Sequence, residues 1–257
     1  MSVKTIRDFV GRKGGAPLVC LTAYTSYMAT LISPHVDMIL VGDSLGMVQY
    51  GMRSTVPVSL EMMSYHGRAV TQGAPDSLVV VDMPFGSYQK SKEDAFEACA
   101  SILKRTDCTA IKLEGGAEMA ETIQYLTERG VAVLGHIGLK PQSVHTHGGY
   151  RMMGKKEQEK QSIMDDALAV QQAGAFGMVL ECVDSDLASE ITKSVNIPTI
   201  GIGASAACDG QILVTEDLLG MTGGKVPSFV KQYKKLSEDI GDAVMQYSDD
   251  VKKRTEF

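Results

Sequence analysis

Residues 78–116 read LVVVDMPFGSYQKSKEDAFEACASILKRTDCTAIKLEGG, and this stretch decides the fold. It holds two apolar runs, Leu78–Asp82 and Ala110–Glu114, each typical of a strand buried on both faces. Between them, Ser91–Arg105 begins with Ser-x-x-Asp, a helix-capping signal, and carries its apolar residues on one side. A strand–helix–strand unit of this kind predicts parallel strands joined by a right-handed crossover.

The same alternation extends along the chain. Further strands are predicted at Pro17–Ala23, Met38–Asp43, Ala132–His136, Met178–Glu181, Thr199–Gly203 and, least clearly, Ile212–Leu219. Helical patterns follow Thr5 and cover Ala117–Arg129 and Glu157–Ala173, and Pro227–Tyr247 is predicted to form closing helices. Eight units in 257 residues predict an α/β fold, a (β/α)8 TIM barrel in one catalytic domain over residues 1–257 with extra terminal helices. An open doubly wound sheet is the main competitor, and Gln211–Met221 could equally be helical.

Composition narrows the class of protein. The formal net charge of −6, with no basic stripe, argues against nucleic-acid binding. The five cysteines stand singly, which favours reduced thiols in a cytoplasmic protein. There is no signal-peptide pattern and no apolar run long enough to span a bilayer, so we expect no membrane partner.

Polar residues stand at the ends of consecutive predicted strands. They are Asp43 with Ser44, Asp82, Lys112 with Glu114, His136 and Glu181. The carboxyl ends of barrel strands open onto one mouth, where active sites lie, so these side chains are expected to converge. Lys112 and Glu114 are two residues apart and therefore share one face of their strand. The alternative is that such residues only cap surface loops.

The acidic members of this set indicate a metal site. Asp43, Asp82 and Glu114 are hard oxygen ligands without an accompanying cysteine, which favours Mg²⁺. A 2-oxo acid could chelate such an ion, and a cation on its keto oxygen would lower the cost of removing the neighbouring C–H proton. Glu181 follows the apolar run Met178–Leu180, so a raised pKa is expected, and it is the candidate base.

Three other patterns have simpler explanations. Gly149–Lys155 nearly forms a phosphate-binding loop but lacks the following Ser or Thr. Gly201–Ala206 resembles a dinucleotide fingerprint, although too little chain follows to complete that fold. His145 and His147 could be a metal pair, but a polar surface loop is the better interpretation.

Eight ordered segments are more specific together than any one alone. They are Val41–Met47, Asp82–Phe85, Lys112–Gly116, Gly135–Leu139 with Pro141–Ser143, Gly148–Tyr150, Leu180–Val183, Gly201–Ala204 and Asp209–Leu213. Together they closely resemble the ketopantoate hydroxymethyltransferase family over nearly the whole chain. That family belongs with the phosphoenolpyruvate mutase and isocitrate lyase type of barrels.

The resemblance implies a transferase of pantothenate (coenzyme A) biosynthesis. It would move a hydroxymethyl group from 5,10-methylenetetrahydrofolate to 3-methyl-2-oxobutanoate, forming 2-dehydropantoate through a Mg-stabilised enolate. Asp43 and Asp82 would bind Mg²⁺, with Glu114 binding it directly or through water. The partners implied are the small-molecule 2-oxo acid, the folate and further copies of the chain in a homo-oligomer, commonly a homodecamer.

The resemblance also implies roles for the remaining strand-end residues. Ser44 would hold the substrate carboxylate, Lys112 would bind substrate oxygens and His136 would lie beside the product hydroxyl. Glu181 would be the proton acceptor. Departures such as Ser205, where glycine is expected, touch no presumed catalytic position but leave the folate contacts open.

Three alternatives to this transferase remain open. The first is an imine-forming aldolase with Lys112 as nucleophile, which the many hard ligands argue against. The second is a related metal-dependent lyase or mutase acting on another 2-oxo acid. The third is a non-catalytic ligand-binding barrel, and the intact strand-end residues argue against it.

Overall fold

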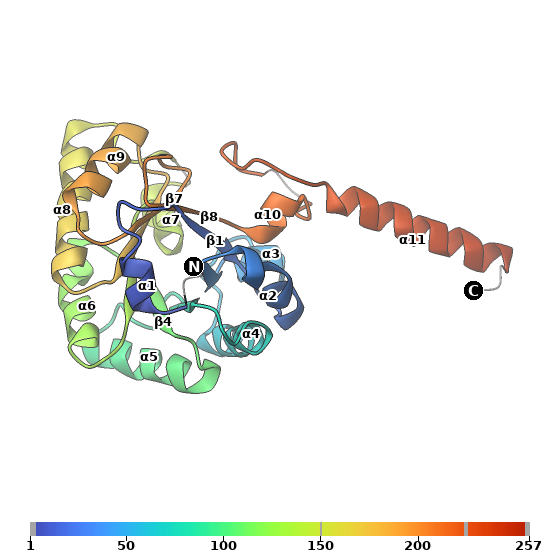
Figure 1. Ribbon diagram of the computed structural model, residues 1–257, viewed down its shortest axis with the longest axis horizontal. Coiled ribbons are helices and arrows are strands. Elements are labelled where there is room, and N and C mark those ends of the chain that lie inside the picture. Colours follow the sequence, from blue (N-terminus) through green and yellow to red (C-terminus); the bar gives the residue numbers. More distant parts are fainter. Residues whose placement is uncertain (1–3, 150, 224–225, 255–257) are drawn as a thin grey trace. The chain divides into compact units, whose positions relative to one another are not determined.

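The structure, a computed structural model, describes residues 4–149, 151–223 and 226–254. The chain divides into two compact units, Met1–Ile212 and Leu213–Phe257. The strands form a closed parallel barrel in the order β1 to β8, with helices around it (Figure 1). Their bounds are β1 (Leu18–Thr22), β2 (Met38–Val41), β3 (Val79–Asp82), β4 (Ala110–Glu114), β5 (Val133–Gly138), β6 (Gly177–Glu181), β7 (Thr199–Ile202) and β8 (Gly210–Leu213). The predicted TIM-barrel fold is confirmed, and the open sheet is excluded.

The helices of the first unit begin where the sequence offers caps. Thr5 and Asp8 form a capping box, and Ser91 Oγ accepts a hydrogen bond from the backbone nitrogen of Asp94 at 3.1 Å, as its capping signal predicts. The helices are α1 (Ile6–Val10), α2 (Ser26–Ile32), α3 (Leu45–Val48), α4 (Leu60–Gly73), α5 (Lys92–Thr106), α6 (Ala120–Thr127), α7 (Val144–His147), α8 (Glu157–Gln172) and α9 (Ser185–Ser194). Short 3-10 turns in the described part of the chain are η1 (Ser33–His35), η2 (Ala117–Met119) and η3 (Pro141–Ser143).

The eighth strand differs from its prediction. It covers Gly210–Leu213, whereas most of the predicted Ile212–Leu219 strand is the short helix α10 (Thr215–Leu219). Closure of the barrel requires the glycine, because a Cβ on Gly210 would lie 2.6 Å from Leu18 Cβ. The Leu18 backbone nitrogen also donates to the Asp209 carbonyl at 2.8 Å. The dipeptide Asp209-Gly210 at the start of β8 is typical of a turn, so the predicted strand began too late.

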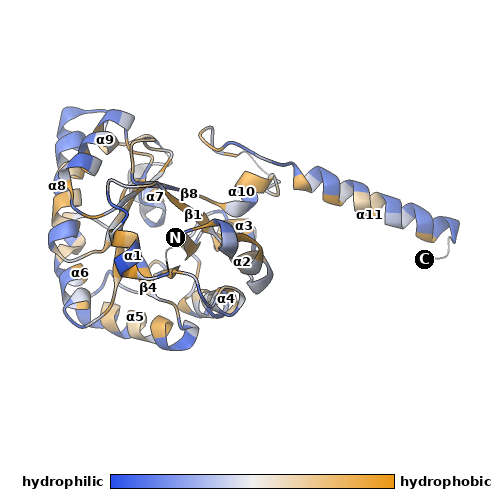
Figure 2. Cartoon of the chain, viewed as in Figure 1, coloured by the Kyte–Doolittle hydropathy of each residue, from blue (hydrophilic) through white to orange (hydrophobic). Residues whose placement is uncertain are grey.

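Apolar side chains fill the two sides of the barrel wall as separate clusters. The inner cluster includes Phe9, Leu40, Val80, Leu134 and Val179. The outer cluster lies between the strands and the helices. Figure 2 shows the strands mostly in the hydrophobic colour, while the surrounding helices carry both colours. The alternation along each strand therefore separates a barrel interior from a helix-facing layer.

The second unit contains α10 and α11 (Leu236–Lys253). The closing helices were predicted at Pro227–Tyr247. The observed helix begins later, at Leu236, and ends later, at Lys253. No residue of α11 is buried, and Ile240 and Val244 are among its exposed apolar side chains. Within the described residues, no helix combines the length and apolarity needed to cross a membrane. The single catalytic domain over residues 1–257 stays a prediction.

Candidate functional site

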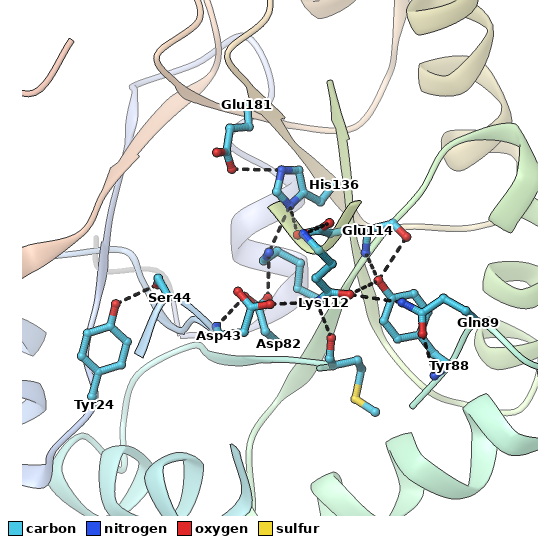
Figure 3. Close-up of polar contacts among 12 residues, drawn as sticks. Tyr24, Asp43, Ser44, Asp82, Tyr88, Gln89, Lys112, Glu114, His136 and Glu181 are labelled. Carbon is cyan, nitrogen blue, oxygen red and sulfur yellow. Dashed lines mark hydrogen bonds and ion pairs between the residues drawn. The ribbon is translucent and has the colours of Figure 1, made fainter. Parts of the chain in front are cut away.

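Strand register aligns the predicted site residues at the carboxyl end of the barrel. The residues paired across neighbouring strands are Asp82 with Lys112, Glu114 with His136, and Gly138 with Glu181. Asp43 follows β2, and its backbone nitrogen donates to Asp82 Oδ2 at 3.1 Å. These side chains therefore meet at one rim, as predicted, and Figure 3 shows them pointing toward one another.

Lys112 lies at the centre of this cluster. Its Nζ is 2.8 Å from Asp82 Oδ1 and 3.1 Å from His136 Nδ1. Burial alone would lower the pKa of Lys112, but the neighbouring carboxylates, Asp82 foremost and then Glu114, hold that pKa above its ordinary value. The lysine is therefore a permanent cation that orients its acidic neighbours.

His136 connects this lysine to Glu181. Burial, with the adjacent Lys112 cation, lowers the pKa of His136 well below its usual range, so the imidazole is neutral. Since Lys112 donates toward Nδ1, the proton of the neutral ring is on Nε2, which lies 3.2 Å from Glu181 Oε2 without meeting hydrogen-bond geometry. Burial raises the pKa of Glu181 to about 7. A carboxylate with that pKa can gain and lose a proton near neutrality.

The three predicted metal ligands form a buried acidic group. Asp43, Asp82 and Glu114 are between 3% and 6% exposed, and burial raises the pKa of each, that of Asp82 to about 7. Three carboxyl groups face one lysine here, and Asp82 Oδ1 has no hydrogen bond besides its ion pair. Hard oxygen donors of this kind fit a divalent cation, which would favour their ionised forms.

This acidic group is not arranged as a finished metal cage. In the described part of the chain, no group of three or more His, Cys, Asp or Glu side chains is placed to hold an ion as it stands. In this state Lys112 Nζ lies 2.8 Å from Asp82 Oδ1, and the Gln142 amide donates to Asp43 Oδ2 at 2.9 Å. The ligand roles of Asp43, Asp82 and Glu114 therefore stay predictions.

Ser44 lies beside the acidic group at the end of β2. Its Oγ is 2.8 Å from the hydroxyl of Tyr24, a residue only 1% exposed that follows β1. This hydrogen bond restrains the position of Ser44 Oγ. Ser44 is predicted from its position at a strand end, whereas Tyr24 is not, since an aromatic residue just after a strand has the pattern of ordinary core.

Gln142 and Tyr88 are also missing from the predicted site. Gln142 is 5% exposed, and its backbone nitrogen donates to Glu114 Oε2 at 3.1 Å. Tyr88, 1% exposed, donates its hydroxyl to Gln142 Oε1 at 2.7 Å. The sequence signal for Gln142 is its place in the Pro141–Ser143 motif of the family resemblance. Nothing local distinguishes Tyr88.

The remaining sequence candidates lie apart from this cluster or beyond what is described. His145 is exposed on the four-residue helix α7, where a loop had been predicted. The side chain of His147 and the whole of Tyr150 lie outside the described residues. The five cysteines are free, as predicted.

Fold and site together define an α/β-barrel enzyme with a buried, charged centre at the carboxyl ends of its strands. Solved structures share the fold at low sequence identity. The barrel is similar to 2,3-dimethylmalate lyase, a PEP mutase/isocitrate lyase superfamily member, with a TM-score of 0.61, 13% identity and coverage of 97% of this chain and 86% of that one. It is also similar to phosphonopyruvate hydrolase in complex with oxalate and Mg²⁺, with a TM-score of 0.60, 13% identity and coverage of 95% and 97%.

Sequence comparison is more specific. The family model of ketopantoate hydroxymethyltransferase matches residues 3–257. A 3-methyl-2-oxobutanoate hydroxymethyltransferase of Rhizobium etli is 57% identical, covering 94% of this chain and 89% of the relative. One of Bordetella petrii is 54% identical, covering 98% and 91%. The chain belongs to the ketopantoate hydroxymethyltransferase family, which confirms the predicted family.

Proposed function

We propose that this chain transfers a hydroxymethyl group from 5,10-methylenetetrahydrofolate to 3-methyl-2-oxobutanoate, forming 2-dehydropantoate. The observation that carries the proposal is the contact of Glu181 with His136, on the same rim as three buried carboxylates and Lys112. Family membership supports the acceptor and the transferred group. The folate donor and Mg²⁺ are the finer parts of the proposal.

Glu181 is the proposed proton acceptor. Its carboxylate takes the proton from C3 of the oxo acid, and the C–H electron pair forms the new bond to the donor's methylene carbon. Both bonds between the methylene carbon and the donor's nitrogens break, and the hydroxyl group of one water bonds to that carbon. The other hydrogen of the water and the proton taken by Glu181 go to the two nitrogens, so that tetrahydrofolate leaves and the atoms balance. A pKa of about 7 suits this exchange, because about half of the base is ionised near neutral pH and the carboxylate is basic enough to accept a proton.

Asp43, Asp82 and Glu114 would hold the divalent cation. When bound, Mg²⁺ would stabilise negative charge on the substrate's keto oxygen by several kcal/mol. The protein's own part is to hold these carboxylates together in a buried site, and the Lys112 cation beside Asp82 partly offsets the effect of burial by favouring the charged form.

Lys112 and Ser44 would orient the substrate. The lysine cation would bind substrate oxygens, and the serine hydroxyl, fixed by Tyr24, would bind the substrate carboxylate. The raised pKa of Lys112 argues against the imine-forming alternative, because a nucleophilic amine must be neutral. His136, neutral and 3.2 Å from Glu181, would lie beside the product hydroxyl.

The test is an assay of 3-methyl-2-oxobutanoate with 5,10-methylenetetrahydrofolate, with Mg²⁺ or with a chelator. We expect 2-dehydropantoate only when the cation is present, and loss of both cation binding and turnover in Asp82→Ala. Asp76→Ala, at an exposed loop position, is the matched control and should behave as wild type. Equal turnover in chelator, or no product with this pair of substrates, would contradict the proposal.

We also propose that the chain works as a homo-oligomer, a decamer as the family resemblance implies. The exposed apolar side chains of α11, among them Ile240, Val244 and Val251, support an assembled state because water disfavours such a surface. Light scattering of the purified protein tests the subunit number. A monomer at assay concentrations would contradict this part.

A further inference from the structure

Gln142 connects acidic residues that come from different strands. Its side-chain Nε2 donates to Asp43 Oδ2 at 2.9 Å, and its backbone nitrogen donates to Glu114 Oε2 at 3.1 Å. Asp43 follows β2 and Glu114 ends β4, so one residue of η3 bonds both carboxylates. Figure 3 labels the two carboxylates, Asp43 and Glu114, together with Tyr88 and Gln89.

The orientation of the Gln142 amide is fixed from both ends. Its nitrogen faces two acceptors, Asp43 Oδ2 and the Met83 carbonyl, the latter also at 2.9 Å. Its oxygen accepts from the Tyr88 hydroxyl at 2.7 Å and from Gln89 Nε2 at 3.2 Å. A flipped amide would place oxygen against oxygen at Asp43 and Met83, so only one orientation satisfies the network.

Tyr88 links this amide back to Glu114. The Glu114 backbone nitrogen donates to the Tyr88 hydroxyl at 3.1 Å, and that hydroxyl donates its own proton to Gln142 Oε1. Glu114 is therefore tied to Gln142 at both its carboxylate and its main chain. Such a closed network restrains the separation of the Asp43 and Glu114 carboxylates.

Gly138 lets the chain return to this position. Its φ of +88° lies in the left-handed region, and a Cβ there would come within 2.5 Å of the Glu181 carbonyl oxygen and of Val183 Cγ2. The turn places the next residue against β6, where the Leu139 nitrogen donates to the Glu181 carbonyl at 2.8 Å. From there η3 brings Gln142 into the site.

We propose that Gln142 is the positioning residue that sets the Asp43 and Glu114 carboxylates for the divalent cation, with Tyr88 fixing its amide. The inference rests on the proposed function insofar as those carboxylates bind a cation. Gln142 would act through these metal-binding carboxylates, without touching the substrate. Partners of this kind typically alter metal affinity by about 10- to 100-fold when removed.

The first test is the Mn²⁺ affinity of full-length Gln142→Met, measured by the electron paramagnetic resonance signal of free Mn²⁺. Met keeps the length and removes both polar atoms of the amide. We expect the Kd to rise about 10-fold or more, with kcat reduced more than the KM for the oxo acid is raised. Gln161→Met, which loses an exposed helix contact to Asp165, is the matched control and should keep the wild-type Kd.

The second test separates positioning from folding. Tyr88→Phe leaves Gln142 in place but removes the hydroxyl, so we expect the Mn²⁺ Kd to rise about 5-fold, the value of one neutral hydrogen bond. The thermal midpoint of each variant is measured in chelator. Wild-type Mn²⁺ affinity in Gln142→Met, or in Tyr88→Phe if the first variant does not fold, overturns the inference.

The two proposals fail differently. If wild-type protein binds no Mn²⁺, or if binding survives Asp43→Ala, the metal part of the proposed function fails and the inference falls with it. If wild-type binding depends on Asp43 but not on Gln142 and Tyr88, only the inference fails. If Mn²⁺ binds as expected but 2-dehydropantoate does not form, only the proposed reaction fails.

Discussion

The two ends of the barrel interior are built on the same strands but differ in chemistry. On β4 the inward positions run Ala110, Lys112, Glu114, and on β5 they run Leu134, His136. At the amino end these positions join Phe9 in an apolar cluster, and Phe9 packs edge-on against Phe176 with ring centroids 5.5 Å apart. At the carboxyl end they are ionisable and almost fully buried.

The contrast separates residues that contribute stability from residues that cost it. Burying apolar side chains stabilises the folded chain by roughly 25 cal/mol per Å². Burying Asp43, Asp82 or Glu114 disfavours the charged form, as their raised pKa values indicate. Burial of the apolar end therefore offsets the free energy that is lost by burying ionisable groups at the carboxyl end of the barrel.

A substitution at the carboxyl end of the barrel should have the largest effect on the rate of the reaction. In Glu181→Gln the amide cannot accept a proton, so we expect exchange of the C3 proton of 3-methyl-2-oxobutanoate with solvent deuterium to slow by about 10²- to 10⁴-fold. Proton NMR of the substrate measures this. Glu190→Gln, exposed on α9, is the control. Undiminished exchange in Glu181→Gln would remove Glu181 as the base.

Changing the apolar end should instead act on stability. Leu134 is fully buried, so Leu134→Ala is expected to lower the free energy of unfolding by about 2–5 kcal/mol. The control is Leu31→Ala, because Leu31 is 50% exposed and its loss should cost about 0.5 kcal/mol or less. Urea denaturation measures both. Equal effects of the two variants would show that the apolar cluster does not stabilise the barrel as argued.

The pH dependence of the free energy of unfolding should also distinguish the carboxyl end of the barrel from the amino end, with no change in packing. Burial raises the pKa of Glu181 from 4.5 to about 7, so the folded chain binds this proton more tightly than the unfolded chain. Its stabilising contribution is then complete below about pH 4.5 and is lost as the pH rises through about 7. Denaturation of wild type and Glu181→Gln in chelator measures it. The variant should lack this part of the decline, and identical pH profiles would contradict the assignment.

The smallest effect is expected at the edge of the mouth. Tyr24→Phe removes the hydroxyl that holds Ser44 Oγ, so we expect the KM for 3-methyl-2-oxobutanoate to rise about 5-fold with little change in kcat. Steady-state kinetics measures the two constants. Tyr27→Phe, 73% exposed on α2, should change neither. A fall in kcat alone in Tyr24→Phe would mean that the phenol acts on the chemical step.

Much of the site followed from strand periodicity. Lys112 and Glu114 were placed on one face because side chains alternate along a strand, and both do point into the barrel. Gln142 and Tyr24 could not be found this way. Both come from connecting segments, where no period fixes the direction of a side chain, and each reaches the site only through the path of its loop.

By itself the sequence determined the parallel strand–helix alternation, the strand ends that carry charge and the family to which the chain belongs. Tertiary structure decided the start of β8, where close approach to Leu18 requires Gly210. It also decided the partner of each buried charge, such as Asp82 for Lys112 and Glu181 for His136. The physical reason is range, since side-chain direction is a local property of the backbone, whereas the pairing of buried charges depends on barrel closure and on distant segments brought into contact.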